Sequence, residues 1–321
     1  MIRSTEPGRN STAIINTVFT PHIASRTSAA ISAILLLPAF CASCEALQQE
    51  PVKIILQATK VQRALDVYFF DATAPCLLDS YQQILPGDTL SYALSCQGEK
   101  RIALLSATAG DLYSRAWVTC YDDLKRVSFR LEDDSPQEPM VYAVADIDAG
   151  ASRSVELSLK PLLIAIRVKS VSCDFVDSRM FHNDKFYLVN AVSESCPLDG
   201  GRPVSWSNFG REESEIPFLS GAGLGDIGKE RIYPADAVLY TYPNPGGSPP
   251  TRLVLEGTVG DIRCYYPVTL TGLEAGKEYS LDITIKRMGT DDPDTTAVPG
   301  TYYIDYITEP WHETASSVET F

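Results

Sequence analysis

Two cysteines three positions apart, Cys41 and Cys44, are the first residues of this chain whose types and spacing could do chemistry. A C-x-x-C pair serves as a redox couple or as half of a metal site when it lies inside a folded domain. These two instead follow the apolar run 31–40, which is too short to span a bilayer and has the length of a signal-peptide core. In a bacterial lipoprotein the acceptor cysteine follows small residues, and Ala42 and Ser43 supply them. The pattern favours lipidation of Cys44 over an ordinary cleaved signal peptide, and over redox or metal chemistry.

Residues 1–43 are therefore expected to be a leader, and residues 44–50 a polar tether that begins at the lipidated cysteine. The leader is unusual because a long stretch of mixed composition precedes its apolar run. No other run in the sequence is long enough to cross a membrane as a helix. We expect an exported chain that is held at the outer membrane by lipid.

A glycine pattern, G-x-G-x-x-G, occurs at 223–228. This pattern binds a dinucleotide when a strand comes before it and a helix follows it. Pro234 stands in the segment that would have to be the helix, and proline disrupts a helix interior. The sequence therefore favours a glycine-rich loop that binds no cofactor.

The three histidines form no recognisable catalytic or metal-binding motif: His22 falls in the leader, and His182 and His312 are isolated from each other. Neither H-E-x-x-H nor G-x-S-x-G occurs. The acidic stretch 291–294 lacks the ligand spacing of an EF-hand loop and favours a turn. We expect no enzymatic activity, no catalytic residue, no cofactor and no metal site.

Six cysteines remain after Cys44, and their spacing fits no metal site. An even number in an exported chain permits up to three disulfides. Several of the six lie in apolar strand-like context, so free thiols packed in a core are equally open. The six are Cys76, Cys96, Cys120, Cys173, Cys196 and Cys264.

Composition excludes one large class of function. The formal net charge is -14, whereas a protein that binds nucleic acid needs basic surface to neutralise phosphates. A content of 45% hydrophobic and 21% charged residues suits a packed globular protein. The 16 tyrosines, with proline and glycine spread along the chain, favour β-sandwiches with many turns.

The hydrophobic pattern indicates strands nearly everywhere. Leu281, Ile283 and Ile285 alternate with polar residues, as in a strand with one buried face. One short helix is expected at 121–127, and no stretch carries an amphipathic helix of three turns. We predict an all-β chain with one sandwich at 51–160 and a second at 161–321. The main strands are expected at 52–58, 64–72, 90–96, 101–110, 162–171, 185–192, 237–243, 252–259, 265–270, 279–287 and 301–308.

The C-terminal part carries a pattern that resembles a known family. An alternating strand, "YSLDITIKR", leads into a "GTDDP" turn, and a last strand, "TYYIDYITEPW", ends on a tryptophan. The pattern resembles the C-terminal end of fimbrillins, the type V pilins, which include FimA-like fimbrial subunits and cell adhesion lipoproteins. Tyr279, Gly289, Thr290, Pro293 and Trp311 fill the matching places. The "R-N-H" that often precedes the tyrosine strand is replaced by "AGKE", which indicates a divergent member.

The resemblance implies two tandem transthyretin-like β-sandwich domains and a structural or adhesive subunit of a surface fimbria. In the polymerising members of that family a protease specific for arginine removes the first strand, and a donor strand from the next subunit fills the resulting groove, a form of β-augmentation. An anchor subunit keeps its first strand. The implied partners are other fimbrial subunits, the outer membrane through a lipid anchor, and host or bacterial surface receptors.

On this resemblance, cleavage is expected between Arg63 and Ala64, unless Arg63 is an ordinary residue of an anchor subunit. The segment from about Tyr302 to Phe321 is the candidate donor strand. Alternatively, 301–308 complete the second sandwich, and only the tail is donated. A protein that binds glycan or host protein at the surface without polymerising is the alternative function. The candidate donor residues are Tyr302, Ile304, Tyr306, Trp311, Val318 and Phe321.

Overall fold

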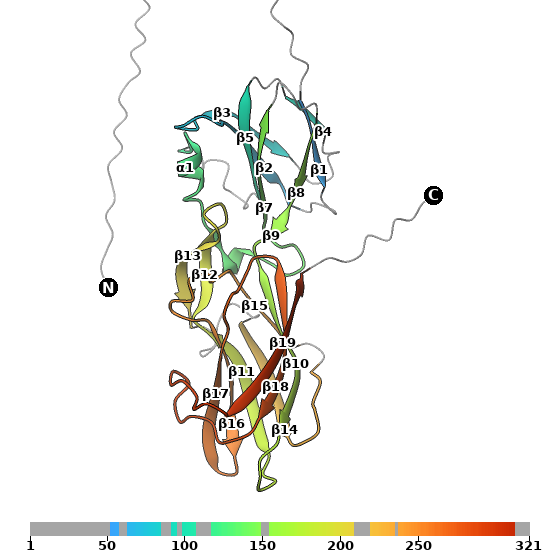
Figure 1. Cartoon of the computed structure of the whole chain (residues 1–321), viewed down its shortest axis with the longest axis vertical. Helices are drawn as coiled ribbons and strands as arrows, with labels where there is room; N and C mark the ends of the chain where they lie inside the picture. The colour runs from blue at the N-terminus through green and yellow to red at the C-terminus, as the bar shows by residue number, and fades with distance from the viewer. Residues whose placement is uncertain are drawn as a thin grey trace, which may run out of the picture. The chain divides into compact units, whose positions relative to one another are not determined.

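The computed structural model describes residues 52–57, 63–84, 91–94, 98–106, 117–148, 154–208, 219–234 and 237–311. Over these residues the regular secondary structure is β-strand, apart from α1 (Tyr121–Leu124) and the 3-10 helix η1 (Leu131–Asp133), as Figure 1 shows. The predicted all-β class is confirmed, and α1 lies inside the stretch expected to be helical. Within the described part of the chain, no helix has the length and apolar composition to cross a membrane. Cys44 and the leader lie outside the described residues.

Two sheets are built from the first half of the chain and pack face to face. Their common layer is a cluster of buried apolar residues that includes Val67 of β2, Leu104 of β5 and Leu157 of β8. The five-stranded sheet has the order β3 (Leu78–Ile84), β2 (Leu65–Asp71), β5 (Glu99–Ser106), β7 (Val141–Asp148), β9 (Lys160–Pro161). The three-stranded sheet has the order β4 (Ser91–Leu94), β1 (Val52–Gln57), β8 (Ser154–Ser158).

Two four-stranded sheets form the second half. Alternation along β18 is as predicted, because Leu281, Ile283 and Ile285 are buried while the residues between them are half-buried. One sheet has the order β15 (Val238–Thr241), β10 (Ile164–Cys173), β18 (Lys277–Ile285), β19 (Tyr302–Pro310). The other has the order β14 (Ser220–Ile227), β11 (Phe181–Val189), β16 (Arg252–Val259), β17 (Ile262–Thr269).

A further small sheet takes strands from both halves of the chain. β12 (Ala191–Cys196) pairs with β13 (Arg202–Ser207) and also with β6 (Phe129–Arg130), which comes from the first half. The main cluster of buried residues likewise contains residues of both halves, from Tyr68 to Trp311. The two halves therefore share packing as well as a covalent link.

The glycine-rich stretch 223–228 is largely strand β14 rather than the expected loop. β11 has a bulge between Asn183 and Lys185, where its register shifts against both neighbouring strands. The backbone of the bulge presses on β14, so a Cβ on Gly223 would lie 2.2 Å from the Asp184 carbonyl oxygen. Glycine is needed here for close approach of two backbones, not for binding a phosphate.

The described cysteines are all free thiols. Cys173, Cys196 and Cys264 are buried, and burial raises the pKa of each thiol, to about 11 for Cys173. Thiols with raised pKa values carry little thiolate and react slowly. These three therefore behave as small core residues.

Candidate assembly site

The first strand, β1, is the central strand of its sheet. It pairs antiparallel with β4, with Val52 opposite Leu94, and parallel with β8, with Lys53 opposite Ser154. A central strand fills two hydrogen-bonding ladders at once. Removing β1 would leave a gap with an unpaired ladder on both sides.

The gap would lie over apolar side chains. Leu65, Phe69 and Ile102 of the five-stranded sheet cluster with Leu157 of β8, and each is at most 2% exposed. Because β8 is hydrogen-bonded to β1, the three-stranded sheet forms one wall of this cluster. An open groove at β1 would therefore have free backbone groups at its sides and an apolar floor, as a strand-accepting site requires.

Arg63 and Ala64, the predicted cleavage pair, immediately precede β2, and both are half-buried. A cut between them would separate β1 from the rest of the chain. The Arg63 guanidinium does not point freely into solvent: its Nη1 donates a hydrogen bond to the Asp133 carbonyl oxygen at 3.2 Å. Cleavage at this position stays a prediction.

The neighbour of that contact, Asp134, is a buried carboxylate. Its Oδ1 accepts hydrogen bonds from the backbone N–H groups of Ser135 and Met140, both at 2.8 Å. Its Oδ2 accepts one from the Tyr242 hydroxyl at 2.9 Å. Burial raises the pKa of Asp134 to about 6, against these hydrogen bonds and the Arg63 charge, which lower it. No spacing in the sequence indicates this group, because Asp134 and Tyr242 are 108 residues apart.

The candidate donor segment is paired within its own sheet. β19 pairs antiparallel with β18 along its whole length, from Tyr302 opposite Ile285 to Pro310 opposite Lys277. Figure 1 shows β10, β18 and β19 running side by side. The Tyr302 hydroxyl donates to the Pro267 carbonyl oxygen at 2.5 Å. Donation of this strand to another subunit stays a prediction, and it would first require β19 to leave β18.

The other candidate donor residues differ in their burial, and two of them lie outside the described residues. Ile304 is half-buried, whereas Tyr306 is 58% exposed. Trp311 is buried, its ring lies 5.7 Å from that of Tyr240, and its backbone N–H donates to the Gly276 carbonyl oxygen at 2.8 Å. Val318 and Phe321 lie outside the described residues. Trp311 therefore anchors the C-terminal end of β19.

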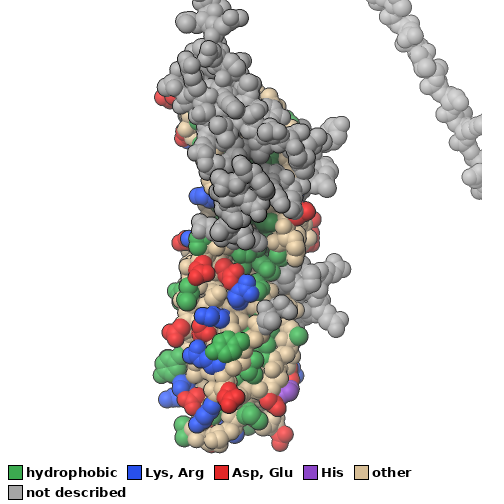
Figure 2. All heavy atoms as spheres, turned by 90° about the vertical axis from the view of Figure 1, so that its right-hand side faces the viewer, with side chains coloured by type: hydrophobic (Ala, Val, Ile, Leu, Met, Phe, Trp, Pro, Cys, Tyr) green, Lys and Arg blue, Asp and Glu red, His purple; other side chains and the backbone are tan. Residues whose placement is uncertain are grey.

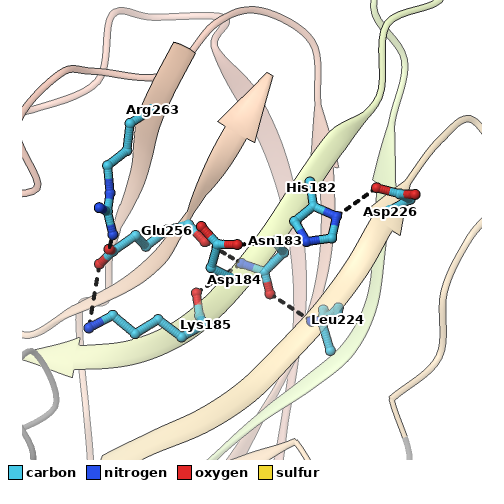
Figure 3. Close-up of polar contacts among 8 residues, drawn as sticks. All are labelled: His182, Asn183, Asp184, Lys185, Leu224, Asp226, Glu256 and Arg263. Atoms are coloured by element: carbon cyan, nitrogen blue, oxygen red, sulfur yellow. Dashed lines mark hydrogen bonds and ion pairs between the residues drawn. The ribbon is translucent and has the colours of Figure 1, made fainter. Parts of the chain in front are cut away.

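A polar cluster lies where β11, β14, β16 and β17 meet (Figure 3). Asn183 is 1% exposed; its Nδ2 donates to the carbonyl oxygens of Lys185 and Glu256, and its Oδ1 accepts from the Leu224 N–H. The buried Glu256 carboxylate forms ion pairs with Arg263 and Lys185. These groups satisfy one another around the bulge, so their role is structural.

His182 lies at the exposed side of the same cluster (Figure 3). Its Nδ1 is 2.6 Å from an Asp226 carboxylate oxygen, and this hydrogen bond raises the pKa of the imidazole above its usual value. Among the described residues, no group of three or more histidine, cysteine, aspartate and glutamate side chains is placed to hold a metal ion. On the face shown in Figure 2, acidic, basic and apolar side chains are interspersed over the coloured surface.

Comparisons with known proteins identify the fold. No protein-family model matches the sequence, and no curated protein matches it either. Among solved structures, a candidate cell adhesion protein from Parabacteroides distasonis matches with a TM-score of 0.56 and 13% identity, over 82% of this chain and 99% of that one. A fimbrilin (FimA) from Porphyromonas gingivalis matches with a TM-score of 0.55 and 12% identity, over 83% and 99%. A candidate cell adhesion protein from Bacteroides eggerthii matches with a TM-score of 0.51 and 17% identity, over 82% and 96%.

The class that emerges is an all-β chain with the fold of these adhesion and fimbrial structures. The alignments cover nearly the full length of each neighbour, so the likeness extends to both halves of the fold. At these identities the likeness concerns the fold.

Proposed function

We propose that this chain is a structural and adhesive subunit of a surface fimbria, assembled by donation of a β-strand from one subunit to the next. The observation that carries the proposal is the position of β1, which is central in its sheet and joined to β2 through Arg63. No other described strand is both central and at the N-terminal end of the folded part. The shared fold of a fimbrilin supports the same assignment.

The mechanism begins with removal of residues 44–63, which include the lipidated Cys44, by a protease that cuts after arginine. The groove that β1 leaves must then accept a strand that pairs with both β4 and β8. The six residues of β1 span about 20 Å at 3.3 Å per residue. The tail 312–321 is long enough for this, since ten extended residues reach about 33 Å.

Lipidation of Cys44 would hold the precursor at the outer membrane until it is cut. One acyl chain binds a membrane only marginally, whereas two or more anchor it stably. Replacing Cys44 with serine should abolish labelling of the protein by a fatty-acid analogue. Labelling that persists in the variant would eliminate this cysteine as the acceptor.

Two measurements test assembly. The N-terminus of protein purified from the cell surface should be Ala64, and the polymer should run as a ladder that resists SDS. A mature chain that starts at Cys44 would indicate an anchor or a surface protein that does not polymerise. Deleting 312–321 should leave folded, exported monomers that no longer assemble, and unchanged assembly would exclude the tail as the donor.

A further inference from the structure

The segment from Phe129 to Asp134 ties the two halves of the chain together. It lies between β5 and β7 in sequence, both of which belong to the first half, yet β6 at its start pairs with β12, with Phe129 opposite Ser195. Phe129 is 1% exposed and Leu131 is fully buried, both in the core cluster that spans the halves. Opening this segment would therefore disturb packing in the second half.

The end of the segment is fastened by hydrogen bonds to Tyr242. The Tyr242 hydroxyl, fully buried, lies 2.9 Å from Asp134 Oδ2 and 3.2 Å from the Arg130 carbonyl oxygen. Asp134 also closes its own turn through the N–H groups of Ser135 and Met140. The Asp134 carboxylate thus connects the turn after η1 with Tyr242, the residue that directly follows β15.

Arg63 contacts the same place from the N-terminal side. Its Nη1 donates to the Asp133 carbonyl oxygen at the end of η1, where a helix has carbonyl groups without partners inside it. Its charge lowers the pKa of Asp134, opposing the effect of burial. Its Nε is buried and has no acceptor among the described residues, so the net stabilisation from this side chain is modest.

We propose that Arg63 is a latch on the segment 129–134, and that cutting after Arg63 loosens this joint between the halves as well as freeing β1. The inference rests on the proposed cleavage for its biological meaning. The contact itself exists in the uncut chain. Maturation would remove both a hydrogen-bond donor to Asp133 and a positive charge close to Asp134, at the site where the two halves share a sheet.

We therefore expect the packing of segment 129–134 against the second half to open less often in the precursor than in the mature subunit. Cleavage also creates a new α-amino group on Ala64, which brings its own positive charge. The effect of the guanidinium is therefore isolated by substitution in the uncut chain. A subunit that must adapt to its neighbours in a filament would gain this adaptability only after it is cut.

The test is hydrogen–deuterium exchange of the full-length, uncut chain, read by mass spectrometry on peptides that cover 129–134. Replacing Arg63 with glutamine should speed exchange in these peptides about fivefold to tenfold, the equivalent of one typical intramolecular hydrogen bond. Arg63→Lys, which keeps the charge but loses the planar donor fork, should have a smaller effect. Arg101→Gln is the matched control, because Arg101 pairs with Asp146 on a different strand pair.

Unchanged exchange at 129–134 in Arg63→Gln would overturn the latch, and so would an increase spread evenly over all peptides. The same peptides are then compared before and after cutting with an arginine-specific protease, with the new N-terminus sequenced. Faster exchange at 129–134 after the cut supports the latch, whereas no change at a verified cut after Arg63 overturns the link to maturation. Failure of the proposed function is separate, since it is read from the N-terminus of surface protein.

Discussion

Replacing Asp134 with asparagine should make the folded chain more stable at neutral pH and remove part of its pH dependence. The Asp134 carboxylate is 6% exposed, and its pKa is raised from 3.8 to about 6, chiefly by burial. At 1.36 kcal/mol for each pKa unit, the ionised side chain costs the folded state about 3 kcal/mol above pH 6. The raised pKa means that between about pH 4 and pH 6 the folded chain holds a proton that the unfolded chain has released. The free energy of unfolding therefore falls as pH rises through this window.

The asparagine side chain can keep the local hydrogen bonds. Its Oδ1 accepts from the same two backbone N–H groups that Asp134 uses. Its Nδ2 donates to the Tyr242 hydroxyl, which is free to donate to the Arg130 carbonyl oxygen at 3.2 Å. The hydrogen bonds of the two backbone N–H groups and of the Tyr242 hydroxyl are kept, so the change removes a charge without opening a cavity.

Urea unfolding at pH 4.0 and pH 7.5 measures the effect. The difference in unfolding free energy between Asp134→Asn and the parent should grow by about 2 to 3 kcal/mol in favour of the variant from the lower to the higher pH. Asp146→Asn is a control whose profile should stay nearly parallel to that of the parent over this range, because Arg101 lowers the pKa of Asp146 below 3.8 and the stabilising charge is lost only at lower pH. Parallel pH profiles for Asp134→Asn and the parent would refute the argument that the buried ionised carboxylate is costly.

Two further substitutions test the packing described above. Gly223→Ala should destabilise the chain by about 1 to 3 kcal/mol in thermal unfolding, because the new Cβ would lie 2.2 Å from the Asp184 carbonyl oxygen. Gly246→Ala is the control and should be nearly neutral, because its new Cβ meets no atom within 4 Å. Equal effects of the two substitutions would contradict the close approach of the backbones at Gly223. Trp311→Ala should lower the free energy of unfolding by about 3 to 5 kcal/mol and increase hydrogen exchange along β19. Tyr303→Ala should change both quantities little, because the Tyr303 side chain is 62% exposed. If the two variants behave alike, Trp311 does not anchor the strand.

Strands with one buried face could be predicted, because burial imposes alternation on the sequence. β18 alternates without interruption, and its limits were placed within two residues. β10 was predicted too, although its register shifts between Val168 and Ser170, which no local pattern indicates. β3, β12 and β13 were missed because their sequences are short or polar and they are held mainly by pairing with neighbours.

The candidate site was only partly predictable, for the same physical reason. Arg63 could be proposed from its position between two apolar runs, which is local information. Its partner Asp133 is 70 residues away, and the contact depends on how a turn of the first half is held by the second. A buried carboxylate such as Asp134 looks like any surface aspartate in sequence, since only the three-dimensional fold places Tyr242 above it.

Removing the first strand and removing the C-terminal tail would affect the stability of the fold very differently, and this difference bears on assembly. β19 is an edge strand, so losing the tail beyond Trp311 breaks no described pairing. β1 is central, and losing it uncovers a cluster that includes Leu65, Phe69 and Leu157. Uncovering a few such side chains, at about 1.5 to 3 kcal/mol each, approaches the roughly 5 to 15 kcal/mol by which a whole domain is stable. A subunit cut after Arg63 would therefore aggregate or unfold unless another strand replaced β1 promptly, so cleavage and strand donation would have to be closely coupled in time.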